Sequence, residues 1–296
     1  MASRTKQWIV LVVAFVVAAV VIHDRYTPYT NVGYQKDSII QMISTEVENQ
    51  LQNRQQNRKT GKDPLRITEW WQASSLLKWD WEKPPEYLCG EMVKKGNWHV
   101  CMDKLFNIKP PCLVYSFGIW NDFSFDDAMG RLGCEVHSFD PSIGKKSHNR
   151  SDNVHFHDIG LSGTDDDMFV PTKNIYVNKT TTWKVRRLGT IKAMLGHADK
   201  HIDYLKMDVE SSEWPALKDV VKSDLLATVR QFGIEWHLFS AYPSKHQYVG
   251  FYKTVMAIKE TGFRTIRSDF HKKNFRERGW RLQADVNYVN TLFTDL

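Results

Sequence analysis

Beyond Pro110 the chain alternates short apolar, β-branched runs with longer runs whose apolar residues recur at helical spacing. The short runs predict seven strands, at residues 112–117, 134–139, 153–159, 202–207, 229–235, 262–267 and 286–293. The longer runs predict helices around residues 125–132, 190–198, 212–221 and 247–261. Strands that alternate with helices are typical of a mostly parallel sheet covered by helices. We therefore expect residues 111–296 to form a doubly wound α/β domain whose last strand returns antiparallel.

Two segments fall outside this alternation. Residues 174–187 alternate in polarity and are rich in β-branched side chains, which predicts an inserted hairpin or an extended loop. Residues 66–110 contain a group of four tryptophans: Trp70, Trp71, Trp79 and Trp81. Tryptophans can line a sugar-binding surface, but aromatic residues at the start of a domain more commonly pack on its core. We therefore expect residues 66–110 to be an N-terminal segment that packs on the sheet domain.

The N-terminal end carries an uncharged, apolar run. Residues 8–22 form this run, and Arg4 and Lys6 precede it. A helix over this run spans ~23 Å, which is short for an average bilayer but sufficient for the thinner secretory membranes. The basic flank favours a cytoplasmic N-terminus, so residues 1–23 are expected to be a cytoplasmic tail and signal-anchor helix. A cleaved signal peptide and a buried core helix are the alternatives.

Residues 24–65 are polar, and residues 48–62 are rich in Gln, Asn and Arg, which predicts a stem. An anchor followed by a stem is also the arrangement of Golgi glycosyltransferases. We therefore expect a single-pass type II Golgi membrane protein with a lumenal domain, or a secreted protein if the signal is cleaved. Asn149 and Asn178 begin N-glycosylation sequons, which agrees with a lumenal glycoprotein.

The chain has four cysteines, namely Cys89, Cys101, Cys112 and Cys134. An even number in an oxidising compartment permits disulfides, and four cysteines allow three complete pairings. Cys89 and Cys101 are close in sequence and precede the sheet, so this pair is the bridge we expect. Buried free thiols and a zinc site are the alternatives, although the CxxC spacing common in zinc sites is absent.

Composition and charge narrow the class of protein. Hydrophobic residues make up 42% of the chain and charged residues 25%, which excludes wholesale disorder and a multi-span membrane protein. The formal net charge is +6, and residues 264–281 hold seven Lys or Arg against two acidic residues. Such a cluster often binds nucleic acid, but a lumenal location removes that partner. We expect a solvated or membrane-facing surface instead, or contact with an anionic acceptor.

Two predicted strands end in residues suited to a nucleoside-like ligand. Gly118 follows the first strand, where a glycine lets a ligand approach the backbone and the next helix offers free N–H groups. Asp140 ends the second strand, 22 residues later, where a carboxylate can accept hydrogen bonds from ribose hydroxyls. A dinucleotide fingerprint needs three glycines, so NAD and FAD are disfavoured.

The fourth and fifth predicted strands end in ionisable residues, namely Asp208, Glu210, Glu235 and His237. The carboxyl ends of neighbouring parallel strands meet at one rim of the sheet, so these side chains are expected to converge. Together they would be costly in a core and useful in an active site.

Five segments follow one another in an order that resembles a known family: YSFGIWNDFSF, HSFDPS, NVHFHDIGLSG, YLKMDVESSEW and FGIEWH. Together they resemble the FkbM-related methyltransferases, particularly the animal methyltransferase-like 24 branch, over about residues 89–293. Cys89 and the segment WHVCMD resemble that branch as well. The chain departs from the pattern in two places, because the glycine-rich turn is reduced to Gly118 and Ser211 stands where the DxEGxE motif has glycine.

The resemblance implies a Rossmann-like class I methyltransferase that transfers a methyl group from S-adenosyl-L-methionine to oxygen or nitrogen. It places the Gly118 turn at the methionine part of this donor and Asp140 at its ribose. Asp158 or Ile159 would border the adenine, and Asp208 would close the site. The implied cofactor-binding set is Phe117, Gly118, Ile119, Asp140, Pro141, Asp158, Ile159 and Asp208.

The donor's sulfonium already activates the methyl group, so the protein mainly has to align the reactants and exclude water. A hydroxyl acceptor also loses its proton near the transition state. His237 and Glu210 compete as the base, and a neutral imidazole is the better match near pH 7. Asp208 completes the expected catalytic set, while Glu235 and His237 are expected to contact the acceptor. Three carboxylates alone are not a ligand signature, so a metal held by Asp208, Glu210 and Glu235 stays the alternative.

The expected acceptor is a hydroxyl of a terminal glycan sugar in the Golgi lumen. This expectation rests on the anchor and the stem, which resemble those of lumenal glycan-modifying enzymes. A lipid, a small molecule or a protein side chain is the alternative acceptor. A non-catalytic binding protein that retains the fold is the alternative class.

Overall fold

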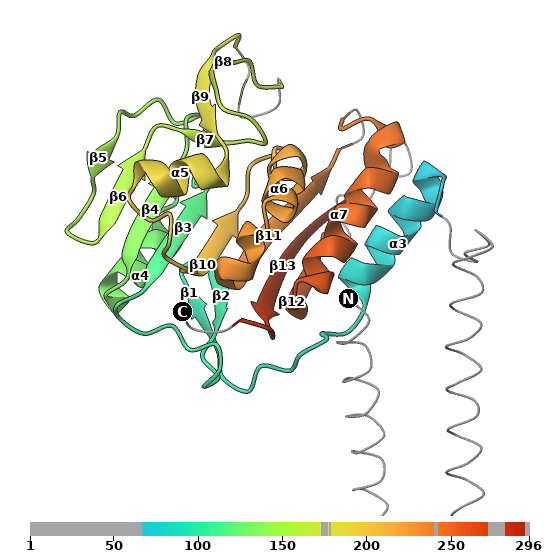
Figure 1. The fold of residues 1–296 in the computed structure, drawn as a ribbon, viewed down its shortest axis with the longest axis horizontal. Coiled ribbons are helices and arrows are strands. Elements are labelled where there is room, and N and C mark those ends of the chain that lie inside the picture. Colours follow the sequence, from blue (N-terminus) through green and yellow to red (C-terminus); the bar gives the residue numbers. More distant parts are fainter. Residues whose placement is uncertain (1–66, 173–176, 178, 240–241, 272–281, 294–296) are drawn as a thin grey trace, which may run out of the picture. The chain divides into compact units, whose positions relative to one another are not determined.

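The computed structural model describes residues 67–172, 177, 179–239, 242–271 and 282–293, which belong to the compact unit Ile67–Leu296 (Figure 1). The predicted anchor and stem, residues 1–23 and 24–65, lie outside the described residues. None of the helices in the described part combines the length and the apolar character that a membrane crossing requires.

A mixed eight-stranded sheet forms the centre of this unit, in the order β12-β13-β11-β10-β3-β4-β6-β5 (Figure 1). Its strands are β3 (Leu113–Phe117), β4 (Glu135–Phe139), β5 (His148–Asn149), β6 (Val154–His157), β10 (Ile202–Met207), β11 (Val229–Leu238), β12 (Phe263–Phe270) and β13 (Leu282–Asn290). The strands β6, β4, β3, β10 and β11 are mutually parallel, whereas β13 runs antiparallel between β11 and β12. Each of the seven predicted strands has a counterpart in this sheet, and the last one returns antiparallel as expected. The short strand β5 was not predicted, so the expected seven-stranded sheet is corrected to eight strands.

The order of the strands reverses between β3 and β10. The chain builds β4 and β6 on one side of β3 and then returns to build β10 and β11 on the other side. Ligands of doubly wound sheets bind at the carboxyl ends of the strands beside such a switch point. Every position of β3 and β10 is buried, as expected for parallel strands covered on both faces.

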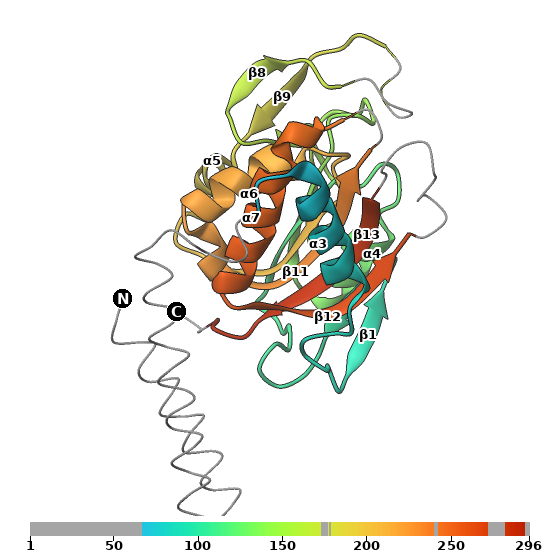
Figure 2. The ribbon, with the colours of Figure 1, turned by 90° about the vertical axis from the view of Figure 1, so that its right-hand side faces the viewer.

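Helices cover both faces of the sheet (Figures 1 and 2). They are α3 (Trp70–Glu82), α4 (Ser124–Leu132), α5 (Leu188–Met194), α6 (Glu213–Lys222) and α7 (Tyr248–Glu260). One core cluster contains residues of α3, α5, α6 and α7, and a second contains residues of α4 on the opposite face. The four predicted helices are confirmed to within a few residues, whereas α3 was not predicted.

The segment before the sheet packs on both faces. In α3, the ring of Trp81 stacks on Trp236 of β11 with 5.9 Å between centroids. A hairpin of β1 (Met92–Lys95) and β2 (Trp98–Cys101) places Trp98 and Val100 in the second core cluster. Trp71 and Trp79 are exposed, so only some of the tryptophans contribute to the core.

Two disulfides join the four cysteines. The Cys89–Cys101 bridge confirms the expected pair, and Cys112–Cys134 is the second bridge. All four cysteines of the chain are therefore paired, and neither the zinc site nor the free thiols apply. The second bridge ties the start of β3 to the start of β4, at the end of the sheet opposite their carboxyl ends.

A small three-stranded sheet lies beyond the carboxyl ends of the main strands, in the order β7-β9-β8 (Figure 1). It consists of β7 (Gly160–Leu161), β8 (Asp166–Phe169) and β9 (Trp183–Arg186). β9 falls within residues 174–187, where the sequence predicts an inserted hairpin or loop. β8 and β9 pair antiparallel, and β7 adds to β9 in parallel.

Candidate functional site

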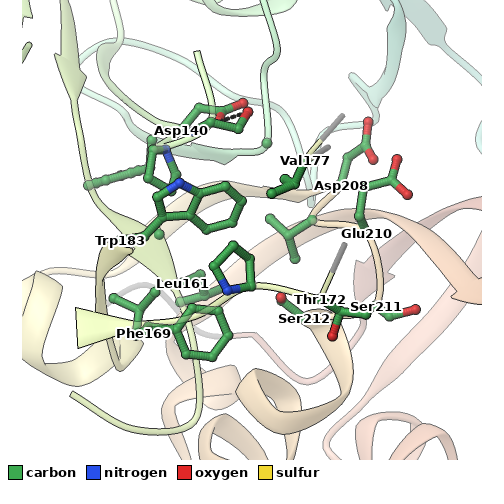
Figure 3. A pocket seen from close by; sticks show the side chains of 18 of the residues that line it. Asp140, Leu161, Phe169, Thr172, Val177, Trp183, Asp208, Glu210, Ser211 and Ser212 are labelled. Atoms are coloured by element: carbon green, nitrogen blue, oxygen red, sulfur yellow. Dashed lines mark hydrogen bonds between the residues drawn. The ribbon is translucent and has the colours of Figure 1, made fainter. Parts of the chain in front are cut away.

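A cavity of about 480 Å³ lies between the carboxyl ends of the central strands and the small sheet (Figure 3). The main sheet contributes the turn after β3 with Gly118 and Trp120, the loop after β4 with Asp140, Pro141 and Ser142, and residues 208–212 after β10. The small sheet contributes Leu161, Phe169, Trp183 and Val185. The cavity therefore occupies the switch point at which a doubly wound sheet binds its ligand.

The Gly118 turn has a backbone that a larger residue could not adopt. Gly118 has φ +72°, and a Cβ atom on it would stand 1.6 Å from the carbonyl oxygen of Asp208. Its amide N–H donates to the Phe139 carbonyl at 2.9 Å, and the Asp208 amide donates to the Phe117 carbonyl at 3.0 Å. The glycine thus lets the loops after β3 and β10 touch, and both Gly118 and Asp208 line the cavity.

Asp140 connects two loops of the cavity wall. Its Oδ2 atom accepts a hydrogen bond from the Trp120 amide at 2.7 Å. Its Oδ1 atom accepts bonds from the amide and the hydroxyl of Ser142, at 2.8 and 2.6 Å. A carboxylate oxygen has two acceptor sites, so Oδ2 retains one for a ligand hydroxyl. The carboxylate is therefore already held in place before a ligand arrives.

One side of the cavity is apolar. Leu161, Phe169 and Trp183 lie together there, across from Asp208 and Glu210 (Figure 3). Aromatic and aliphatic side chains of this kind suit a flat heteroaromatic ring. Sequence reasoning missed these residues, and the alternating pattern of residues 174–187 was the one available signal for Trp183.

Glu210 and Ser211 adopt backbone conformations that side chains rarely take. Their φ angles are +53° and +76°, in the left-handed region that favours glycine. Ser211 is the residue at which the DxEGxE motif has glycine, so the backbone keeps a glycine-like shape despite the substitution. The Ser211 hydroxyl donates to the carbonyl of His237 at 3.2 Å, which links the loop after β10 to the end of β11. Strain of this kind is concentrated at functional sites.

The carboxyl groups of this loop have shifted pKa values. Burial raises the pKa of Glu210 to about 7, with His237 opposing the rise and Glu213 adding to it. Burial also raises the pKa of Asp208, while Lys206 opposes it. Both groups hold a proton more readily than an exposed carboxylate does.

His237 is buried and does not line the cavity. Its side chain is 1% exposed, and Nδ1 lies 2.8 Å from Oε1 of Glu213. Burial alone would lower the pKa of His237, but Glu213 and Glu235 raise it well above the usual value. The structure therefore corrects the premise that His237 is a neutral imidazole in contact with the acceptor.

The structure brings Gly118, Asp140, Pro141, Asp208 and Glu210 to the cavity. The other predicted site residues do not line it: Phe117, Ile119, Asp158, Ile159, Glu235 and His237. Phe117 is buried against Phe139 with ring centroids 4.5 Å apart, and Ile119 is 3% exposed in a separate apolar cluster.

The residues that line the part of the cavity expected to hold adenine come slightly later in the chain than predicted. Gly160 and Leu161 line it in place of Asp158 and Ile159. The Asp158 amide donates instead to the Ser147 hydroxyl at 2.9 Å, and Ile159 packs against the main core cluster. β7 begins directly after these two residues, and it is the strand that brings the backbone to the cavity.

Glu235 stays at the rim of the sheet, beside His237. Its carboxylate accepts a hydrogen bond from Gln283 of β13, and its Oε1 atom lies 3.4 Å from Nε2 of His237. Asp208, Glu235 and His237 each offer one ligand atom, and these atoms lie within 4.8 Å of one another. They are thus close enough together to bind one ion.

Comparisons with known proteins agree with this geometry. A family model described as a methyltransferase domain matches residues 34–290. The human protein "Probable methyltransferase-like protein 24" is 31% identical over 208 residues, which cover 67% of this chain and 54% of that protein. The rat protein of the same name is 32% identical over 207 residues, with the same coverage. The match spans about half the length of these curated relatives.

Among solved structures, one similar chain is a variant of the 16S rRNA (adenine(1408)-N(1))-methyltransferase from Catenulisporales acidiphilia. It is 10% identical, with a TM-score of 0.30, and the match covers 69% of this chain and 98% of that one.

Proposed function

The chain belongs to the methyltransferase-domain family, as the resemblance predicted, and from that premise we propose that it transfers a methyl group from S-adenosyl-L-methionine to a hydroxyl acceptor. One observation carries the proposal. The cavity joins an apolar, aromatic side, the Asp140 carboxylate that can accept from a ribose, and the Glu210 carboxylate across from the apolar side (Figure 3). These are the parts that a nucleoside donor and a hydroxyl acceptor need.

The residues present fit the donor. Asp140 retains an acceptor site for the ribose hydroxyls, and Phe169, Trp183 and Leu161 would enclose the adenine. The Gly118 turn and Asp208 would border the methionine part, where their close backbone contact leaves no room for a side chain. When bound, this donor supplies a methyl group that its positive sulfur activates for transfer.

The chain's own residues then orient the acceptor and remove its proton. Glu210 faces the cavity and is our candidate base, because His237 is buried and does not line the cavity. His237 holds the loop after β10 through Glu213, whose Oε1 atom also accepts from the Val209 amide at 3.1 Å. We thus assign His237 a positioning role.

The proposed acceptor is a hydroxyl of a terminal glycan sugar, met in the Golgi lumen by a type II membrane protein. Two disulfides support an oxidising compartment, and the exposed Asn149 offers a glycosylation site there. The apolar run at residues 8–22 supports the anchor. Nucleic acid is not a proposed partner, since such a compartment holds none.

The test is incubation of the purified full chain with methyl-labelled donor and a panel of free glycans, glycolipids, small alcohols and peptides. We expect label on a glycan hydroxyl, released as the methyl ether of one sugar on hydrolysis. Label on lipid, small molecule or peptide alone would replace the proposed acceptor class. Donor binding without label on any acceptor would instead indicate a binding protein that retains the fold.

A further inference from the structure

We propose that Asp208, Glu235 and His237 bind a divalent transition-metal ion of the Mn²⁺ type beside the cavity that Asp208 lines. These residues come from the ends of the adjacent strands β10 and β11, and their ligand atoms lie within 4.8 Å of one another. The role of the ion in catalysis rests on the proposed function, but the binding site itself does not.

The Nε2 atom of His237 is the first observation behind the site. It is buried and forms no hydrogen bond with any described residue. Its nearest carboxylate oxygens are Oε1 of Glu235 at 3.4 Å and Oε1 of Glu210 at 3.9 Å. Nδ1 on the other side of the ring pairs with Glu213 at 2.8 Å, so it carries the proton of that bond. Nε2 then directs either a lone pair or an N–H at carboxylate oxygens that lie too far away for a well-formed hydrogen bond.

A cation resolves both forms of this conflict. A bare Nε2 lone pair beside carboxylate oxygens is repulsive, and a protonated Nε2 has an ion pair with Glu235 at 3.4 Å but no well-formed hydrogen bond. An ion bound between Nε2 and the carboxylates would use the lone pair and neutralise the charge. Metal-bound histidines commonly donate their other N–H to a carboxylate, which is the part that Glu213 plays here.

The charge around His237 is the second observation. Four carboxyl groups gather there, those of Asp208, Glu210, Glu213 and Glu235. Lys206 is the nearest cation on β10, but its Nζ donates to the backbone carbonyls of Phe117 and Gly118. Nδ1 of His271 lies 3.9 Å from Oε1 of Glu235, and Nε2 of the same ring lies 3.0 Å from Oδ2 of Asp285. Carboxyl groups therefore outnumber the cationic groups beside them, and a bound cation would favour the ionised forms of these carboxyl groups.

The donor atoms indicate the kind of ion. One imidazole nitrogen with two carboxylates suits Mn²⁺, Fe²⁺, Co²⁺ or Zn²⁺, whereas Ca²⁺ and Mg²⁺ prefer oxygen ligands alone. Three protein ligands leave further coordination positions open. Asp208 lines the cavity, so an acceptor hydroxyl could occupy one of those positions.

The bound ion would acidify the acceptor hydroxyl. The acceptor's O–H bond breaks, and its proton passes to the carboxylate of Glu210 and then to water. The oxygen's electron pair forms a new bond to the methyl carbon as the carbon–sulfur bond breaks. The sulfur keeps that bond's electrons and leaves as the neutral thioether of S-adenosylhomocysteine. No oxidant or reductant is needed.

The test measures Mn²⁺ binding directly. The full chain, purified in detergent and stripped with chelator, is titrated with MnCl₂ and followed by electron paramagnetic resonance and calorimetry. We expect one bound Mn²⁺ per chain, with affinity at least tenfold lower in Asp208→Asn and His237→Gln. Circular dichroism and the melting temperature identify any variant that fails to fold, and Asp208→Asn, the more conservative change, then decides.

Asp285→Asn is the matched control. Asp285 forms a neighbouring group with Glu235 and His271, which lacks Asp208 and His237. Unchanged Mn²⁺ affinity in Asp285→Asn, beside a loss in Asp208→Asn, supports the proposed site. The reverse pattern, or no stoichiometric Mn²⁺ on the wild-type chain, overturns it.

Methyl transfer is measured separately, so that the two proposals fail in distinguishable ways. Full transfer activity in the stripped chain would overturn the catalytic role of the ion and leave the methyltransferase proposal intact. Stoichiometric Mn²⁺ without transfer to any acceptor would support the site and count against the proposed function. Transfer that is lost with chelator and restored by MnCl₂ supports both.

Discussion

Single residues determine how the cavity is held open. Gly118 has a glycine-specific backbone because the carbonyl of Asp208 occupies the space of a Cβ atom. Ser211 takes a similar left-handed conformation with a side chain present, and its hydroxyl reaches the carbonyl of His237. Strain at two consecutive positions, Glu210 and Ser211, indicates that the surrounding contacts fix this loop. The loop therefore presents Glu210 to the cavity in one defined orientation.

Asp140→Ala is expected to weaken S-adenosyl-L-methionine binding. The change removes an acceptor for the ribose and also releases the Trp120 amide and Ser142. Leaving such donors unpaired costs ~1–3 kcal/mol, or about 5- to 150-fold in Kd. Isothermal titration calorimetry measures the difference.

Asp158→Ala is the control for this measurement. Asp158 has the same side chain and follows the next strand, yet it does not line the cavity. Its Kd should equal that of the wild-type chain. If Asp140→Ala and the wild-type chain bind the donor equally well, Asp140 is not part of the donor site. If only Asp158→Ala loses donor affinity, Asp158 contacts the donor as the sequence predicted.

The predictability of the site also varies from residue to residue. Gly118, Asp140, Asp208 and Glu210 follow strands of the parallel sheet, so topology alone sends them to one rim. His237 follows the same rule, but its burial depends on contacts with Glu213 that the sequence does not display. Its protonation was therefore out of reach from the sequence.

The elements of the main sheet follow from local pattern. Strands β3, β4 and β10 begin and end within about a residue of the predicted bounds, because buried parallel strands are short apolar runs between turn residues. The prediction placed β13 a few residues too late in the chain, because apolar residues alternate with polar ones at the start of the strand. The last residues of the predicted range lie beyond the strand. Helix α3 was missed, although the Glu69 amide bonded to Gln72 marks a capped helix start.

The small sheet could not be predicted as a wall of the site. Its strands are two to four residues long, and β7 pairs with β9 across more than twenty residues of sequence. No local pattern specifies such a pairing. The sequence identified the insertion but not the position of Phe169 and Trp183 against the cavity.

Phe169→Ala tests whether this element contacts the donor. An aromatic ring stacked on a base is worth ~1–3 kcal/mol, so the Kd for S-adenosyl-L-methionine should rise about 5- to 150-fold. The neighbouring Met168 is 67% exposed on the same strand, which makes Met168→Ala the matched control. A Kd that both variants share with the wild-type chain would show that β8 does not contact the donor.

At the scale of the whole molecule, two disulfides and the N-terminal apolar run agree with a lumenal protein. Cys112–Cys134 joins two strands of the main sheet, and Cys89–Cys101 joins the segment before β1 to β2. Disulfides persist in oxidising compartments and are rare in the cytosol. The compartment in turn determines which acceptors the cavity can meet.

Expression of the full chain in animal cells tests this location. We expect a membrane-bound product whose mass falls after endoglycosidase treatment, because Asn149 is exposed within a sequon. Asn149→Gln should remove one step of that mass change. A cytosolic product without glycans would contradict the lumenal location, and secretion into the medium would indicate a cleaved signal.

The decisive experiment compares the rate of labelled-methyl transfer from S-adenosyl-L-methionine by the wild-type chain and by Glu210→Gln, and determines the donor affinity of each. We expect the wild-type chain to transfer the methyl group to a glycan hydroxyl. The variant should be slower by ~10²–10⁴-fold with an unchanged donor Kd, because general base catalysis contributes that factor. Equal rates would remove Glu210 from the mechanism. A wild-type chain that neither binds the donor nor transfers its methyl group would contradict the account as a whole.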